Sequence, residues 1–303
     1  MMYEDSYLMK SCIVAENRRD KPYIDEAPDA CPFCPGNESD IDEVRLQVKE
    51  NTEDFLVKIV NNKYPVCDTQ TGLYGVHDVV IDTPDHLAHP KDFTEQHWGV
   101  LLLSMQKRWQ EISENPKISF IQIFKNYGRN AGASIKHSHW QIIALAQTPY
   151  SIESQHLQYN AFKEKTGDCY FCTRLNKIEN DYIIFETEYW SAIAPEVSQF
   201  AHETWLISKP HKKHYGELDE DALKECGRLL KRLLMGYDRL KPSGSFNICF
   251  VGGGIRDSLD YHFYIKIIPR LGEWAGFELA TNCYINTVHP RTHAQVMKNI
   301  LRQ

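Results

Sequence analysis

The sequence predicts an α+β fold, in which two tandem repeats share one antiparallel sheet with helices packed on its faces. The first observation is that the order of elements in residues 31–145 recurs in residues 169–269: a C-x-x-C pair, a strand leading into a histidine-containing turn, a helix, and two more strands. The second is that the strand segments are short, rich in β-branched and aromatic residues, and bounded by Gly, Pro, Asn or Asp. Two such halves can place their strands in a single sheet covered by helices.

In the first half, three strands and one helix follow from hydrophobic periodicity. The segments DVVID (78–82), FIQIF (120–124) and QIIAL (141–145) are predicted strands. Apolar side chains recur at helical spacing after Thr94, whose hydroxyl can cap the N-terminus of a helix that runs to about Ile112.

The second half repeats these elements in the same order. TWLIS (204–208), NICFV (247–251) and FYIKI (263–267) are predicted strands, and a helix is expected from Asp219 to about Tyr237.

The two halves can be aligned through their polar residues. The alignment pairs Cys31 with Cys169, His86 with His211, and His139 with His262. A polar stretch from about Pro149 to Gly167 separates the halves, so domains are expected at residues 1–150 and 151–303.

Composition excludes several classes of function. The 303 residues are 42% hydrophobic and 25% charged, the balance of a globular protein with a sizeable core. The net charge of −7 argues against a broad nucleic-acid interface. No apolar run approaches the length of a membrane span, and the first residues lack the apolar core of a signal peptide. We therefore expect a cytoplasmic protein without nucleic-acid or membrane partners.

Four of the nine cysteines form two C-x-x-C pairs, a spacing typical of metal or redox chemistry in a chain without a secretory signal. In the first half, Cys31 and Cys34 can reach one zinc ion from a tight turn, and zinc then needs two further ligands. The candidates are His86, in the TPDH turn, and His137, the first histidine of an H-x-H pair. A redox pair or a chance spacing is the alternative.

The second half offers a matching set of candidate ligands: Cys169, Cys172, His211 and Asp260. Asp260 stands where the first half has His137, and a carboxylate ligand is permitted, although less common, in structural zinc sites. Neither set offers an obvious open position, so zinc is expected to stabilise the fold and not to activate water.

A reactive histidine is predicted on the strand that begins with HSHWQ. Side chains two residues apart share one face of a strand, so His137, His139 and Gln141 line up together. Two histidines and an amide are unfavourable in a hydrophobic core, so this face of the strand is expected to bind a ligand or take part in catalysis. The alternative is that His139 is a strand histidine with a structural role.

A glycine-rich loop comes directly before this strand. Gly128 and Gly132 allow backbone N–H groups to approach an anion closely, and Ser134 adds a hydroxyl donor. A phosphate cradle beside the imidazole of His139 suggests nucleophilic phosphoryl chemistry.

Five blocks of the sequence carry a family resemblance. They are CPFCPGNE (31–38), NNKYP (61–65), TPDH (83–86), NYGRNAGASIKHSHWQ (126–141) and HFYIKIIPRLGEWAGFELATNCYIN (262–286). In this order, over nearly the whole chain, they resemble the galactose-1-phosphate uridylyltransferase family, with its ADP-glucose phosphorylase relatives, in the histidine-triad (HIT) superfamily. The resemblance implies that each half is a HIT-like repeat.

The resemblance implies a nucleotidyltransferase with a ping-pong mechanism. His139 would attack the α-phosphorus of a nucleotide sugar of the UDP-glucose type, and a hexose 1-phosphate would then take the nucleotidyl group. Gln141 would hydrogen-bond the phosphoryl oxygens, where HIT hydrolases have a third histidine, so this amide favours transfer over hydrolysis. Two alternatives stay open: an ADP-glucose-type phosphorylase with phosphate as acceptor, and a zinc-stabilised nucleotide-binding protein without activity. A homodimer is expected by resemblance alone.

The same resemblance assigns further residues. Asn126 and Ser134 match phosphate-contacting positions, Asn62 matches a nucleoside contact, and Glu278 resembles a position near the sugar. The implied zinc ligands are Cys31, Cys34, His86 and His137, with Cys169, Cys172 and His211 resembling a second zinc site of some relatives.

The second half departs from the family pattern. Asp260 replaces a histidine, Tyr264 stands at the equivalent of Gln141, and the glycine loop at 252–254 is shorter. The second half is therefore not expected to form a second catalytic centre, and His262 would serve the structure or the sugar pocket.

Two basic features have open roles. Lys136 stands where the uridylyltransferases usually have proline, and it could meet phosphate or be solvated. The run at 18–21 (RRDK) could clamp phosphates or form a solvated loop.

Overall fold

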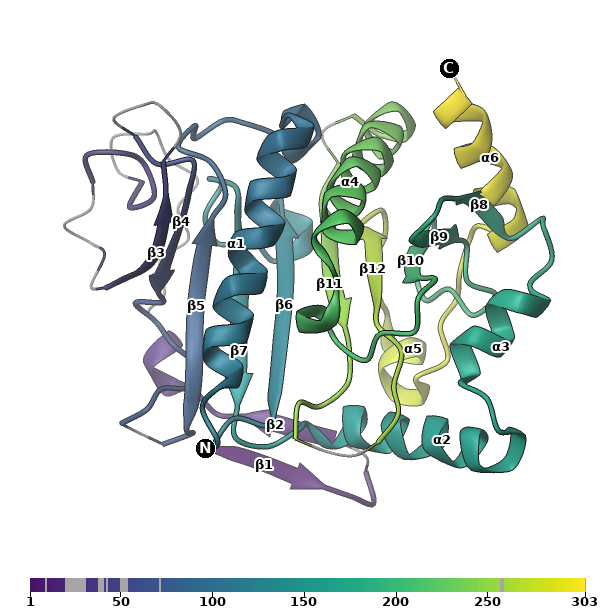
Figure 1. The fold of residues 1–303 in the computed structure, drawn as a ribbon, viewed down its shortest axis with the longest axis horizontal. Helices are drawn as coiled ribbons and strands as arrows, with labels where there is room; N and C mark the ends of the chain where they lie inside the picture. Colours follow the sequence, from purple (N-terminus) through teal and green to yellow (C-terminus); the bar gives the residue numbers. More distant parts are fainter. Residues whose placement is uncertain are drawn as a thin grey trace.

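The computed structural model describes residues 1–8, 10–19, 31–37, 41, 43–49, 54–70, 72–242, 244–256 and 259–302. Within them, ten strands form one antiparallel sheet in the order β3-β4-β5-β7-β6-β11-β12-β10-β9-β8 (Figure 1). The predicted α+β class is confirmed. All six predicted strands overlap strands of this sheet.

The strands fall into two sets of five with the same topology. The first set is β3 (Val44–Val48), β4 (Val57–Asn61), β5 (Gly75–Ile81), β6 (Phe120–Tyr127) and β7 (His139–Leu145). The second set is β8 (Ile183–Glu186), β9 (Trp190–Ile193), β10 (Thr204–Ser208), β11 (Phe246–Val251) and β12 (Tyr264–Pro269). β6 and β11 pair antiparallel at the centre, where Tyr127 lies opposite Phe246. The halves are therefore related by an approximate two-fold rotation between β6 and β11, as a repeated sequence requires.

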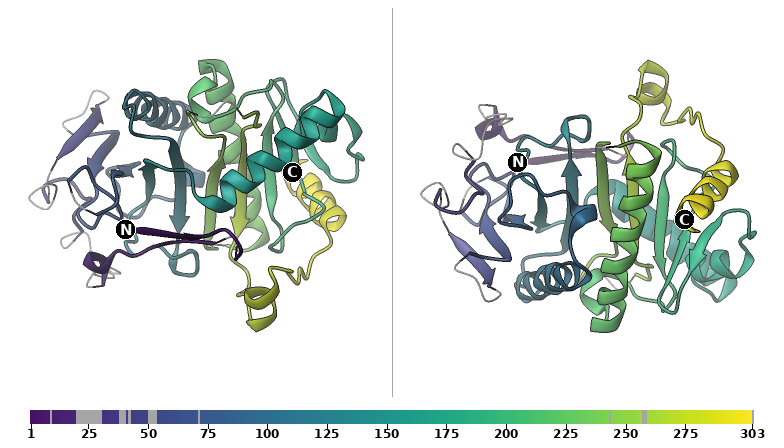
Figure 2. Two further views of the ribbon diagram at one scale, coloured as in Figure 1. Left: turned by 90° about the horizontal axis from the view of Figure 1, so that it is seen from below. Right: turned by 90° about the horizontal axis from the view of Figure 1, so that it is seen from above.

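Helices α1 (Glu95–Ser113) and α4 (Glu220–Leu240) pack side by side on one face of the sheet (Figures 1 and 2). Both begin at the predicted caps: Thr94 Oγ1 accepts from the N–H of His97 at 3.0 Å, and Asp219 Oδ1 accepts from that of Ala222 at 2.9 Å. Their apolar stripes form the main core with the sheet beneath.

The remaining elements surround this central layer. They are the hairpin of β1 (Met2–Asp5) and β2 (Lys10–Ile13), and helices α2 (Tyr150–Thr166), α3 (Tyr170–Lys177), α5 (Gly276–Thr281) and α6 (Pro290–Arg302). The polar stretch expected between the halves contains α2, which lies near the hairpin and crosses the ends of the strands (Figure 2). Among the described helices, each is too short or too polar to span a bilayer.

The alternation along β7 separates a structural face from a polar one. Trp140 is fully buried on the helix side, where its ring meets Trp98 of α1 edge-on at a centroid distance of 6.4 Å. His139 and Gln141 point to the opposite face because successive side chains of a strand alternate. The predicted reactive residues therefore lie on the face of the sheet that α1 and α4 leave open.

Candidate active site and metal centres

A cleft with an open volume of about 720 Å³ lies beside the start of β7. Its walls are mainly apolar, with a few polar groups among them. It is lined by Pro32, Phe33, Ile41, Val60, Asn61, Asn62, Lys63, Tyr64, Val79, Ser134, Ile135, His139 and Gln141. Four residues expected to bind substrate or catalyse, namely Asn62, Ser134, His139 and Gln141, thus line one cavity.

His139 is held in a defined orientation at this cleft. Its Nδ1 lies 2.8 Å from the carbonyl oxygen of His137, and a carbonyl can only accept, so Nδ1 carries the proton. In the neutral ring, Nε2 then keeps its lone pair. The ring of Phe33 packs edge-on against the imidazole at 5.3 Å and limits its rotation. This arrangement gives His139 a nucleophilic nitrogen at a fixed place.

The glycine-rich turn uses part of its own backbone in internal hydrogen bonds, and its role as a phosphate cradle stays a prediction. Gly128 and Gly132 have φ angles of 79° and 81°, which only glycine adopts without strain. The N–H groups of Ala131, Gly132 and Ala133 donate to carbonyls within the turn itself. These three N–H groups are therefore not available to an anion, and the turn instead brings Ser134 to the cleft.

Four expected substrate contacts lie outside the cleft lining: Gly128 and Gly132 of the glycine-rich turn, Asn126 and Glu278. Asn126 sits at the centre of the sheet, where its Oδ1 accepts from Nδ2 of Asn247 at 2.8 Å. The same Asn247 nitrogen donates to the carbonyl of Ala131 at 2.9 Å, so this pair supports the glycine turn. Glu278 instead caps its own helix, α5, by accepting from the N–H of Ala275 at 3.0 Å.

The basic features of the sequence are partly described. Lys136 is exposed. Arg18 donates to the carbonyl of Tyr64, next to the cleft, and burial lowers the pKa of its guanidinium. Arg19 is exposed, and Asp20 and Lys21 of the predicted phosphate clamp lie outside the described residues.

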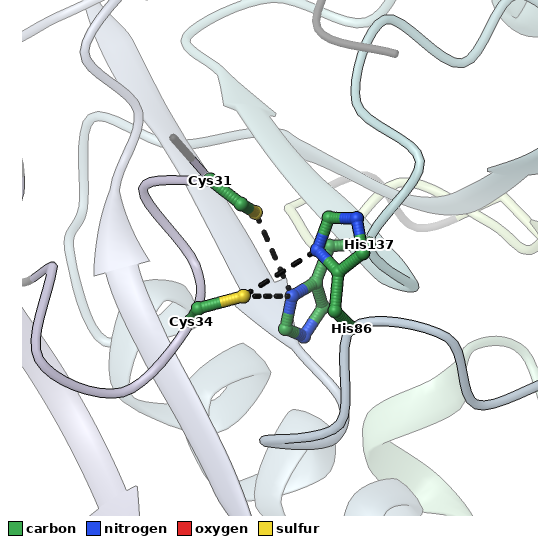
Figure 3. A group of neighbouring side chains, drawn as sticks. All are labelled: Cys31, Cys34, His86 and His137. Carbon is green, nitrogen blue, oxygen red and sulfur yellow. Dashed lines mark hydrogen bonds between the residues drawn. The ribbon is translucent and has the colours of Figure 1, made fainter. Parts of the chain in front are cut away.

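The first Cys/His group comes together as expected. The side chains of Cys31, Cys34, His86 and His137 converge from three separate segments (Figure 3), and their four candidate ligand atoms lie within 4.8 Å of one another. The Sγ atom of Cys34 is 3.4 Å from Nδ1 of His86 and 3.6 Å from Nδ1 of His137. Zinc bonds of about 2.3 Å to sulfur and 2.0–2.1 Å to nitrogen would separate tetrahedral ligands by about 3.5 Å. The donor set and its spacing therefore fit a tetrahedral metal ion.

A hydrogen bond on the far side of the His137 ring leaves its Nδ1 able to bind a metal. Its Nε2 donates to the carbonyl oxygen of Thr83 at 2.7 Å, which leaves Nδ1 without a proton and directed at the cysteines. Burial lowers the pKa of His137, which favours the neutral ring that a metal requires.

The second group corrects one predicted ligand. Cys169, Cys172 and His211 come together with His262, and Asp260 is not among the ligand atoms. Asp260 instead accepts from Nε2 of His211 at 3.0 Å and from Lys163 at 2.8 Å, so it orients a ligand without being one.

The structure also corrects the alignment of the two halves. Nε2 of His262 donates to the carbonyl of Ser208 at 2.6 Å, as Nε2 of His137 does to that of Thr83. His262 therefore corresponds to His137, and not to His139. Tyr264 at the start of β12 then takes the position of His139, so the second half lacks a nucleophilic imidazole there.

Sequence reasoning missed a buried ion pair behind the nucleophile. Lys125, on β6, is fully buried, and its Nζ donates to Asp82 Oδ2 at 2.6 Å, to Ser138 Oγ at 2.7 Å and to the carbonyl of His139 at 3.2 Å. Burial lowers the pKa of Lys125, and Asp82 opposes this change. In the sequence Lys125 gave no signal of this pair, because the same strand also carries the polar residues Gln122 and Asn126.

Sequence reasoning also missed His77. This histidine, on β5, is 1% exposed and contacts Gln141 from the neighbouring strand. A histidine at the start of a predicted strand carried no clear signal of such a contact.

The chain is similar to known proteins over most of its length. A family model described as the N-terminal domain of a domain of unknown function (DUF4931) matches residues 14–148. An ADP-glucose phosphorylase of Arabidopsis thaliana is 31% identical over 292 residues, covering 90% of this chain and 82% of that protein. A galactose-1-phosphate uridylyltransferase of Thermotoga maritima is 26% identical over 284 residues, covering 88% of each.

The fold extends this similarity over the whole chain. The crystal structure of an ADP-glucose phosphorylase from Arabidopsis thaliana with bound ADP-glucose has a TM-score of 0.83 and 29% identity to this chain, covering 98% of it and 97% of the other. The chain therefore belongs to the galactose-1-phosphate uridylyltransferase family with its ADP-glucose phosphorylase relatives, a family of nucleotidyl-transferring and phosphorolytic enzymes in the HIT superfamily.

Proposed function

We propose that this protein transfers a nucleoside monophosphate from a nucleotide sugar to a phosphate acceptor through a covalent intermediate on Nε2 of His139. The observation that carries the proposal is the hydrogen bond from Nδ1 of His139 to the carbonyl of His137, which leaves the nucleophilic lone pair on Nε2 of a residue that lines the cleft.

In the first step, Nε2 of His139 forms a bond to the α-phosphorus. The bond from that phosphorus to the bridging oxygen breaks, and sugar 1-phosphate leaves with its electron pair. In the second step, an acceptor phosphate oxygen attacks the same phosphorus, and the phosphorus–nitrogen bond breaks. The ring is cationic in the intermediate, and the carbonyl of His137 stabilises it by accepting the Nδ1 proton in a hydrogen bond.

The lining of the cleft supports a nucleotide ligand. Phe33, Val60 and Ile135 offer apolar surface for a base, while Ser134 and Gln141 lie on the polar side near His139. Zinc in the first Cys/His group would act as a structural link, because Cys31 and Cys34 precede the sheet and His137 leads into β7. The carbonyl of His137 would then be held where His139 needs it.

We propose ADP-glucose as the donor and inorganic phosphate as the acceptor. The support is that the Arabidopsis ADP-glucose phosphorylase is 31% identical to this chain, against 26% for the Thermotoga uridylyltransferase. Uridylyl transfer from UDP-glucose to a hexose 1-phosphate is the second candidate, because that relative also covers 88% of the chain.

Intact-protein mass spectrometry tests both parts of the proposal. The protein is incubated with ADP-glucose or UDP-glucose without acceptor and quenched at neutral or basic pH, since a phosphorus–nitrogen bond is acid-labile. We expect the mass of the protein to increase by one adenylyl group. Added inorganic phosphate should remove this group, and His139→Ala should prevent its attachment. A uridylyl adduct removed by hexose 1-phosphate would select the second candidate. No adduct with either donor, in protein that contains its zinc, would favour a binding protein without activity.

A further inference from the structure

His77 lies beside Gln141 on the same face of the sheet and does not itself line the cleft. It belongs to β5, the neighbour of β7 in the sheet, and its Nε2 is 3.0 Å from Oε1 of Gln141. Both side chains are largely buried, at 1% and 8% exposure, so this contact is shielded from competing water.

The protonation of His77 follows from its second nitrogen. The backbone N–H of Val66 donates to Nδ1 of His77 at 3.1 Å. A backbone N–H cannot accept a hydrogen bond, so Nδ1 has no proton and Nε2 carries it. Nε2 therefore donates to Oε1 of Gln141.

A third contact offers a check on this assignment. Nδ2 of Asn62 lies 3.0 Å from Nε2 of His77, and Oδ1 of Asn62 accepts from the N–H of Tyr64 at 2.8 Å. Moving the proton to Nδ1 would let Asn62 donate to His77. It would also remove the acceptor from Val66 and the donor from Gln141, so the Nε2-protonated form satisfies more of the contacts.

The orientation of Gln141 follows. A glutamine side chain ends in one acceptor and one donor group, and its amide can turn either end outward. With Oε1 engaged by His77, the NH₂ group remains for the cleft, and it has no hydrogen-bond partner among the described residues. An NH₂ group stabilises negative phosphoryl oxygens, whereas an outward carbonyl oxygen would repel them.

We infer that His77 is a positioning residue, which fixes the amide of Gln141 so that its NH₂ group faces the phosphoryl group on its way to and from His139. The inference rests on the proposed function. His77 does not contact the substrate in this arrangement. It affects the reaction only through the orientation of Gln141.

Rapid-quench measurement of adduct formation tests this dependence. His77→Phe removes the donor and keeps an aromatic ring, and it should lower the rate constant for nucleotidylation of His139 about 10- to 100-fold, the loss typical when a residue that orients a functional group is removed. The half-saturating donor concentration should change much less. His77→Gln should restore most of the rate, because its amide nitrogen can take the place of Nε2.

A double-variant cycle separates positioning from a general structural effect. In the Gln141→Ala background, His77→Phe should cause no further loss of rate, because no amide remains to be oriented. An equal loss in both backgrounds, or an unchanged rate in the single variant, would overturn the inference. If the wild-type protein forms no adduct while folded, the proposed function fails instead.

Nitrogen NMR of the protein labelled with ¹⁵N-histidine gives a readout that does not need turnover. The signals of His77 are assigned by their loss in His77→Gln. We expect a protonated Nε2 and an unprotonated, hydrogen-bonded Nδ1 at neutral pH. A proton on Nδ1 would refute the positioning role whatever the enzyme transfers.

Discussion

The buried pair of Lys125 and Asp82 offers a quantitative test of what holds the strand of His139 in place. Both side chains are fully buried, and their charged atoms are 2.6 Å apart. Replacing Lys125 by Met keeps an unbranched apolar stem and leaves the Asp82 carboxylate without its counter-ion. One oxygen of Asp82 already lacks a partner among the described residues, and the other would keep only the hydroxyl of Ser138 at 3.2 Å. Loss of one partner from such a pair costs about 3–5 kcal/mol.

Urea unfolding of metal-replete protein at pH 7 measures this cost. We expect Lys125→Met to lower the free energy of unfolding by about 3–5 kcal/mol, and Lys125→Met with Asp82→Asn to recover most of it, because the buried charge is then gone. Lys136→Met is the matched control, since this exposed lysine lies on the loop before the same strand, and its change should stay within about 0.5 kcal/mol. A cost below about 1 kcal/mol for the first variant, or no recovery in the second, would refute the reasoning.

Two further predictions concern metal content and acid stability. We expect two zinc ions per chain by elemental analysis. Cys31→Ser and Cys169→Ser should each lose one zinc ion, and only Cys31→Ser should also lose most of its nucleotidylation activity. An equal loss of activity in both variants would contradict separate roles for the two Cys/His groups. Burial, and then the neighbouring His202, lower the pKa of His293 to about 3. Because the unfolded chain binds this proton near pH 6.5, stability should fall as the pH drops below 6.5, by about 2 kcal/mol at pH 5 from this group. His293→Gln should flatten this part of the pH profile in urea unfolding, and an unchanged slope would show that His293 does not contribute.

Local signals in the sequence predicted those parts of the fold that local physics determines. Thr94 and Asp219 cap helices because a side-chain oxygen next to an apolar stripe has the same effect in most contexts. The period-two pattern of β7 predicted that His139 and Gln141 share a face, and the structure has them lining one cleft.

The alignment of the halves could not be fixed in the same way. The loops between the repeated elements differ in length, so pairing His262 with His139 or with His137 is equally consistent with the order of elements. The decision depends on a tertiary contact, the hydrogen bond from each ligand histidine to a carbonyl of the neighbouring strand end. The prediction of Asp260 as a ligand came from the same alignment. The structure has His262, and not Asp260, in the second Cys/His group.

The buried polar groups were beyond sequence reasoning for a different reason. Lys125 and His77 look like ordinary polar residues of half-exposed strands. Their roles arise from partners on other strands, and a single sequence does not record which strands are neighbours. Glu278 contacts the N–H of Ala275 at the start of its own short helix, and its expected position near the sugar stays a prediction.

Because His137 corresponds to His262, the second half of the chain can serve as a reference for the first half. Both halves hold a Cys/His group and a histidine bonded to a strand-end carbonyl, but a phenol follows in the second half where an imidazole follows in the first. A property found in both halves is a candidate property of the shared scaffold, and nucleotidylation is expected in the first half alone, where His139 is present. One sample can therefore report the behaviour of the scaffold with and without its reactive group, at the same temperature, pH and metal concentration.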